Sequence, residues 1–123
     1  DCVSQSPFSM FIPEKNHSDS AILSTQNIME NNFNDKINIE ELAEKASMST
    51  RQFNRRFKSA TGESVNGYLQ LLRIDSAKKS LINTKLSFEE ISLESGYENI
   101  SYFRRIFKKH TSLTPSEYRK RFK

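Results

Sequence analysis

The chain contains an internal repeat with a period of 49 to 50 residues. Residues 53–61 read FNRRFKSAT and residues 103–111 read FRRIFKKHT, so two Phe, one Arg, one Lys and one Thr recur at an offset of 50. Before each of these stretches, IEELAEKA at 39–46 matches FEEISLES at 88–95 at an offset of 49. A chain of 123 residues that repeats in this way is predicted to build two copies of one small unit.

Each copy has the apolar periodicity of two amphipathic helices. In the first copy, helices are predicted over 39–46 and about 50–59, separated by the turn SMS. The second copy has the same order around GYEN, which is one residue longer. Helix, short turn and helix is the helix-turn-helix pattern, here at about 39–59 and about 88–110. Each copy is too small to hold a core alone, so a helix over about 65–82 is predicted to join them in an all-α fold.

Capping residues and apolar faces define the expected boundaries. A helix over 19–33 is expected to begin at Ser18 or Asp19, and Thr114 with Pro115 is expected to open a last short helix. Further N-caps are expected at Ser49, Ser87 and Asn99, with Gly62 ending a helix and Gly96 in the second turn. The side chains expected to face inward are Ile22, Leu23, Ile28, Met29, Phe33, Leu42, Ala43, Ala46, Phe53, Phe57, Tyr68, Leu69, Leu72, Ala77, Leu81, Ile82, Phe103 and Phe107.

Charge is unevenly distributed along the chain. The net charge is +4, but residues 1–35 carry −4 and residues 36–123 carry +8. A basic body behind an acidic leader is typical of proteins that bind nucleic acids, although a solvated Lys-rich surface has the same composition. Residues 1–18, with Pro7, Pro13 and several Ser, are interpreted as a linker, and 19–123 as the folded domain. Because the chain starts with Asp1, we expect it to be a piece of a longer protein.

A polar stripe without acids lies opposite the paired Phe residues in each second helix. Arg, Asn and Ser are the side chains that hydrogen-bond base edges, and an exposed face built only for solubility would carry Lys and Glu equally well. The N-cap of each helix, with its backbone N–H groups, suits a phosphate. The same stripe occurs twice behind a helix-turn-helix pattern, which favours DNA reading over a solvated face. The stripes consist of Arg51, Asn54, Arg55 and Lys58, and of Ser101, Arg104, Arg105 and Lys108.

The predicted joining helix has a suitable length for two units on one duplex. Two reading helices on one side of B-DNA lie about 34 Å apart. A helix of about 18 residues is roughly 27 Å long. One chain could therefore place two units in successive major grooves.

The sequence resembles the DNA-binding domain of AraC/XylS-type transcription regulators. The residues that carry the resemblance are IEELAEKASMSTRQFNRRFKSATGESVNGYLQLLRIDSAKKSL and SFEEISLESGYENISYFRRIFKKHTSLTPSEYRK, and it covers 20–122. The resemblance implies seven helices in two homeodomain-like helix-turn-helix subdomains with a linking helix. It implies a bacterial, cytoplasmic, nucleoid-associated regulator, usually an activator that contacts RNA polymerase. An effector or dimer partner would act through a preceding domain.

Functional residues are carried over by position from this resemblance. Arg51, Asn54 and Arg55 would read bases in one groove, and Ser101, Arg104 and Arg105 in the next. Ile100 stands where the family often has a polar residue, which leaves a thymine-methyl contact there. The leader SPFSMFIPEKNHSD is similar to the junction of a subgroup whose N-terminal half resembles class I glutamine amidotransferases. The expected phosphate contacts are Ser49, Gln52, Lys58, Asn99, Tyr102, Lys108 and Lys109.

The sequence argues against an enzyme, a cofactor and a metal site. His17 lies in the linker, and His110 ends a basic helix, where a cation favours the helix dipole. The pairs Glu40–Glu41 and Glu89–Glu90 are adjacent on a helix and so point different ways; they are interpreted as helix-start charges. Three Gly residues cannot form a glycine-rich phosphate loop, and the single Cys2 allows no internal disulfide.

One alternative class remains open from the residues alone. A basic helical protein–protein module with an acidic partner would present the same charged stripes. Salt weakens both kinds of complex, whereas sequence-selective binding distinguishes them. A membrane-bound role is not expected, because no apolar run approaches the ~18 residues of a spanning helix and the aromatic residues are needed in the core.

Overall fold

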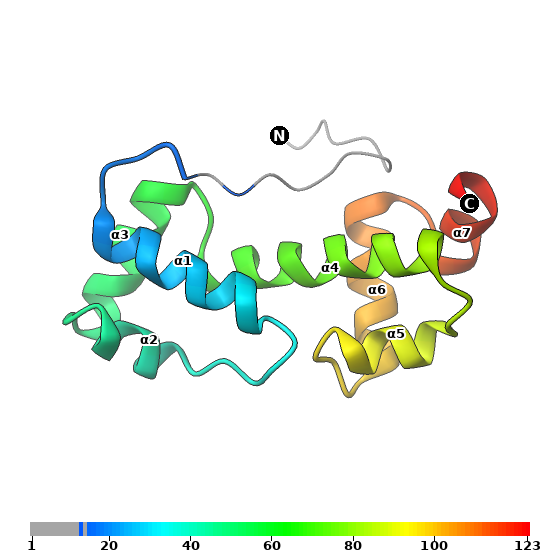
Figure 1. The fold of residues 1–123 in the computed structure, drawn as a ribbon, viewed down its shortest axis with the longest axis horizontal. Helices are drawn as coiled ribbons and strands as arrows, with labels where there is room; N and C mark the ends of the chain where they lie inside the picture. The colour runs from blue at the N-terminus through cyan, green and yellow to red at the C-terminus, as the bar shows by residue number, and fades with distance from the viewer. Residues whose placement is uncertain (1–12, 14) are drawn as a thin grey trace. The chain divides into compact units, whose positions relative to one another are not determined.

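A computed structural model describes residues 13 and 15–123, and this part of the chain forms seven α-helices and no strand. The predicted all-α class with seven helices is therefore confirmed. The predicted linker over 1–18 lies outside the described residues except for 13 and 15–18. The helices, labelled in Figure 1, are α1 (Ser20–Asn32), α2 (Ile39–Lys45), α3 (Thr50–Thr61), α4 (Val65–Asn83), α5 (Phe88–Glu94), α6 (Ile100–Thr111) and α7 (Pro115–Phe122).

Five helices begin at predicted capping residues, whereas the cap of α2, Asn38, was not predicted. Asp19 caps α1, Ser49 accepts the Gln52 N–H at 3.1 Å, and Asn99 accepts the Tyr102 N–H at 2.9 Å. At the end of α3, Gly62 adopts a φ of +82°, the left-handed conformation that favours glycine. The residue that ends α6 at the corresponding position is Ser112, with φ +66°. It was not predicted, because glycine was the only signal used for the end of a helix.

The start of α5 has a reciprocal capping box. The Ser87 hydroxyl accepts the Glu90 N–H at 3.1 Å, and a Glu90 carboxylate oxygen accepts the Ser87 N–H at 2.9 Å. Replacing Ser87 by Ala should lower the free energy of unfolding by about 0.5–2 kcal/mol. Urea unfolding followed by circular dichroism measures this change. Ser59→Ala, at an exposed position of α3, should stay within about 0.5 kcal/mol, and equal effects of the two variants would contradict a role for the cap.

The chain divides into two compact units, which are described separately. The first unit ends at Leu72 and contains α1, α2, α3 and the start of α4. Its core holds two fully buried aromatic residues in edge contact, Phe57 and Tyr68, with ring centroids 5.2 Å apart. Ile22 and Met29 of α1 are fully buried, as predicted.

The inward face of α1 differs from the predicted one. Leu23, Ile28 and Phe33 are only partly buried, whereas Thr25 and Gln26 are buried at 1% and 0% exposure. Gln26 can be buried because its side chain has hydrogen-bond partners there. Its amide donates to the Tyr68 hydroxyl at 3.1 Å, so a polar side chain occupies a core position. A period based on apolar residues alone therefore placed the face incorrectly.

The second unit, Arg73–Lys123, repeats the aromatic arrangement of the first. Phe107 and Tyr118 are buried with centroids 5.5 Å apart at an interplanar angle of 87°. Arg119 of α7 donates to the carbonyl oxygens of Leu81 and Leu86, which connects α7 to the end of α4 and to the loop before α5. The core of this unit consists of Ile74, Ala77, Leu81, Ile91, Phe103, Ile106, Phe107 and Tyr118.

The repeat extends to individual hydrogen bonds. The Thr61 hydroxyl donates to the Phe57 carbonyl at 2.8 Å and accepts the Glu63 N–H at 3.1 Å. The Thr111 hydroxyl donates to the Phe107 carbonyl at 2.8 Å and accepts the Leu113 N–H at 3.1 Å. The end of each second helix is therefore fixed by the same threonine contacts.

Candidate nucleic-acid interface

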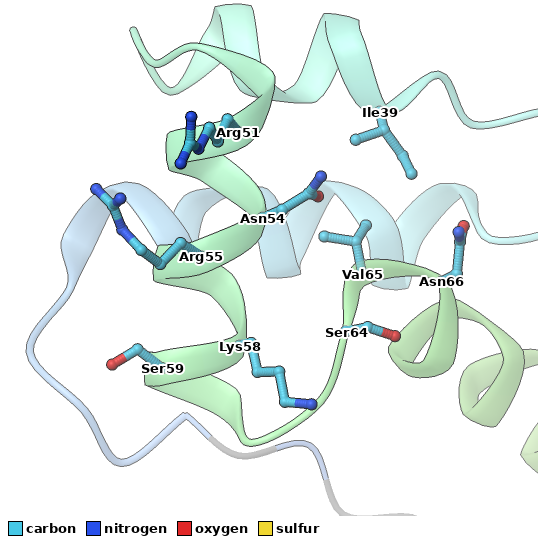
Figure 2. Close-up of a pocket in the computed structure, with 9 residues that line it drawn as sticks. All are labelled: Ile39, Arg51, Asn54, Arg55, Lys58, Ser59, Ser64, Val65 and Asn66. Atoms are coloured by element: carbon cyan, nitrogen blue, oxygen red, sulfur yellow. The ribbon is translucent and has the colours of Figure 1, made fainter.

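The polar stripe of α3 is exposed, as its sequence position predicts. Phe53 and Phe57 are buried at 0% exposure, and this orientation turns the opposite side of α3 to solvent. Figure 2 shows Arg51 and Arg55 projecting from α3 about one turn apart, and Asn54 pointing toward Ile39 and Val65. The structure thus brings the predicted reading residues of the first copy, together with Lys58, onto one surface.

This surface borders a cavity of about 710 Å³ within the first unit. Ile39 at the start of α2 and Val65 at the start of α4 lie opposite Asn54 and give the cavity an apolar side (Figure 2). Cationic side chains lie on α3, and the lining contains no Asp or Glu. The apolar side suits the methyl group of a thymine, and the donor groups suit the polar edge of a base. The cationic side chains suit phosphates. The lining residues are Ile39, Arg51, Asn54, Arg55, Lys58, Ser59, Ser64, Val65 and Asn66.

The polar stripe of α6 in the second unit is exposed in the same way. Ser101, Arg104, Arg105 and Lys108 are exposed, while Phe103 and Phe107 are fully buried. These four residues match Arg51, Asn54, Arg55 and Lys58 at the offset of 50.

The arginines of α6 lie over aromatic rings. The Arg104 guanidinium carbon is 5.5 Å from the ring centroid of Phe88, and that of Arg105 is 5.7 Å from the ring centroid of Tyr102. Phe88 is itself stacked on Phe103 with centroids 5.4 Å apart. Cation–π contacts restrict the rotamers of an exposed arginine. Sequence reasoning missed this role of Phe88, although its alignment with Ile39 marks it as a difference between the copies.

The predicted phosphate-contacting residues are all exposed. Because Ser49 and Asn99 accept the N–H groups of Gln52 and Tyr102, these two N–H groups already have partners. The N–H groups of Gln52 and Tyr102 are therefore not free for a phosphate, contrary to the expectation for the two helix starts. The exposed residues are Ser49, Gln52, Lys58, Asn99, Tyr102, Lys108 and Lys109.

The histidines differ from their expected roles. Burial and the cations of Lys109 and Lys78 lower the pKa of His110, which disfavours the cation that was expected at the end of α6. His17, which was assigned to the linker, has its Nε2 atom 2.8 Å from the side-chain oxygen Oε1 of Gln26. Glu40 and Glu89 lie in the first turns of α2 and α5, which agrees with helix-start charges.

Neither a metal centre nor a membrane span is found where the structure can be described. Across residues 13 and 15–123, no three His, Cys, Asp or Glu side chains gather as a metal would require. Over the same residues, none of the helices combines the length and the apolar character needed to cross a bilayer.

Two small helical units, each with an exposed acid-free helix behind a short turn, define a helix-turn-helix nucleic-acid-binding protein. Comparison with known proteins agrees with this class. A family model described as "Helix-turn-helix domain" matches residues 42–121. The chain belongs to this family, and its fold is that of AraC-type DNA-binding domains.

Three relatives illustrate the similarity. The uncharacterized HTH-type transcriptional regulator YdiP of Escherichia coli is 38% identical over 95 residues, which are 77% of this chain and 31% of that protein. The DNA-binding domain of AdpA, a global transcriptional factor solved with a target DNA, is 25% identical with a TM-score of 0.79, covering 83% of this chain and 92% of that one. An AraC-type regulator from Chromobacterium violaceum is 26% identical with a TM-score of 0.77, and the match covers 83% of this chain and 91% of that one. The chain thus spans about a third of the YdiP length.

Proposed function

We propose that the chain binds a specific double-stranded DNA site by placing α3 and α6 in adjacent major grooves. The observation that carries this proposal is the acid-free stripe found twice, at matching positions, opposite a buried Phe pair. Arg51, Asn54 and Arg55 read one groove, and Ser101, Arg104 and Arg105 read the next. Arg suits guanine and Asn suits adenine, so the stripes have the side chains that base reading requires.

Affinity comes from cations at the edges of these stripes. Lys58, Lys108 and Lys109 are exposed and are assigned to phosphates, together with Ser49, Gln52, Asn99 and Tyr102. Such contacts release condensed counterions and hold every DNA sequence alike. Specificity and affinity therefore rest on different side chains, which makes the two separable by mutation.

The joining helix supports two grooves as the target. α4 is one helix of 19 residues, and it contributes Val65–Leu72 to the first unit and Arg73–Asn83 to the second. At about 1.5 Å per residue it is about 28 Å long. Successive turns of B-DNA are about 34 Å apart, so the length of α4 is close to one turn of the duplex.

Selection from a random DNA pool tests the proposal. We expect recovered sites with two conserved blocks about one helical turn apart, 10–10.5 base pairs centre to centre. A protein–protein module with an acidic partner is the competing function, and it predicts salt-sensitive binding to the pool without enrichment of any sequence. Recovery of no conserved block would reject the DNA-reading function.

The wider role of the protein is proposed from the family resemblance. We propose a bacterial, nucleoid-associated regulator that activates transcription through RNA polymerase and receives its effector or dimer partner through a preceding domain. The stretch SPFSMFIPEKNHSD supports a preceding domain of the glutamine amidotransferase-like kind, acting as a sensor rather than an enzyme. The coding sequence upstream of Asp1 tests this assignment directly.

A further inference from the structure

The segment just before α1 is bonded into the first unit at three points. Lys15 donates through Nζ to the Glu30 carboxylate at 2.7 Å and to the Asn27 side-chain oxygen at 2.8 Å. Two residues further along, His17 Nε2 lies 2.8 Å from the side-chain oxygen Oε1 of Gln26. Asp19 is the third point. We call Lys15–Asp19 the entry segment.

The contact between His17 and Gln26 leads into the interior of the first unit. The Gln26 amide donates to the Tyr68 hydroxyl at 3.1 Å, which in turn donates to Glu30 at 3.0 Å. Because the Gln26 nitrogen is the donor to Tyr68, its oxygen accepts from His17 Nε2–H. His17 Nδ1 then accepts the Asp19 N–H at 3.2 Å. The backbone of Asp19 is thus held by a continuous set of hydrogen bonds that runs to the core.

The Asp19 carboxylate joins the entry segment to the reading helix. One oxygen accepts the Ile22 N–H and caps α1. The same carboxylate accepts two bonds from Arg56 of α3, from Nε at 3.0 Å and from a terminal nitrogen at 2.8 Å. A two-point fork between a guanidinium and a carboxylate fixes orientation as well as distance.

The repeat shows that this fork is peculiar to the first copy. Arg56 is matched at the offset of 50 by Ile106, which is 7% exposed and packs in the core of the second unit. The second copy therefore secures its reading helix by apolar packing at this position. The first copy secures α3 at the same position through a charge on the chain that leads into α1.

We propose that Asp19 and Arg56 are positioning residues for base reading by α3, so that the entry segment sets what the first unit reads. Arg56 lies next to Arg55 and two residues after Asn54. A rotation of α3 about its axis therefore redirects the side chains of Asn54 and Arg55 together. A change in the chain ahead of α1 reaches the stripe through Asp19. This inference rests on the proposed reading role of α3.

Asp19→Asn is the sharpest variant for the test. Asn caps a helix about as well as Asp, so α1 keeps its cap while the charged half of the fork is lost. Arg56→Ile is the second variant, because Ile106 shows that an isoleucine fits at this position of the repeat. Lys79→Gln, which breaks the 3.3 Å pair of Lys79 with Asp75 in the second unit, is the matched control.

The readout is discrimination at each block of the selected DNA site, measured as the affinity ratio between the site and the same site with one block scrambled. The block read by the first unit is the one that Arg55→Ala weakens. We expect Asp19→Asn and Arg56→Ile to lower discrimination at that block by roughly 2- to 30-fold and to leave the other block unchanged. Lys79→Gln should leave both blocks unchanged.

Two outcomes overturn the proposal. Equal loss at both blocks would mean that the fork only stabilises the fold, and no loss at either block would mean that α3 is positioned without it. Failure of the unaltered chain to select any two-block site is different, because it rejects the proposed function itself.

Discussion

Replacing Phe107 by Ala should destabilise the second unit by about 3–5 kcal/mol. The ring is fully buried and makes edge contacts with Tyr118 at 5.5 Å and with Phe88 at 5.9 Å between centroids. A cavity at this point removes contacts from α5, α6 and α7 together. Since whole small domains are stable by only about 5–15 kcal/mol, a large share of the unit's stability is lost.

Urea unfolding followed by circular dichroism measures the effect of Phe107→Ala. Because the chain consists of two units, we expect a second, earlier transition rather than a uniform shift of the whole curve. Leu93→Ala is the control, since Leu93 is 60% exposed and its truncation should change stability by about 0.5 kcal/mol or less. Loss of DNA binding by the Phe107 variant with its helicity and stability intact would contradict a core role.

Replacing Arg105 by Ala should remove the preference at one base pair of the bound site, worth about 1–3 kcal/mol of discrimination. Arg105 is exposed on the stripe of α6 and lies over the Tyr102 ring, so it is available to a base edge. Affinity for scrambled DNA should fall less. Binding to a panel of sites that differ at single positions measures the lost preference.

Lys109→Ala is the matched comparison for Arg105→Ala. Lys109 is exposed four residues further along α6 and is assigned to a phosphate. Its removal should weaken binding to all sequences alike and reduce the slope of log affinity against log salt by about 0.9. If both variants lower affinity while the base preference stays intact, the division between reading and phosphate-binding residues is wrong.

The helices and their limits could be predicted because the signals are local. Capping residues such as Asp19, Ser87 and Asn99, and the sequence Thr114-Pro115, act within one turn of the chain. The buried Phe pairs followed from a spacing of four on a helix. The inward face of α1 was missed because Gln26 is buried by a partner 42 residues away, and local periodicity contains no record of such a partner.

Some features of the candidate site could likewise be predicted from local signals, and others could not. The exposure of both stripes followed from the Phe pairs, since one side of a helix determines the other. The ring of Phe88 beneath Arg104 and the fork between Asp19 and Arg56 depend on contacts between separate elements. Buried Lys78, 5% exposed on α4, was also missed, because a long charged side chain on a helix is ordinarily expected at the surface.

Each copy of the repeat has its own aromatic pair, helix caps and threonine contacts, so neither depends on the other for its internal architecture. The two copies nonetheless differ in the residues of their exposed stripes. An Arg-Asn-Arg set in one half and a Ser-Arg-Arg set in the other illustrate such divergence. Under the proposed function, a single polypeptide of this design is expected to select an asymmetric operator, whose orientation would fix the direction in which the regulator faces a promoter.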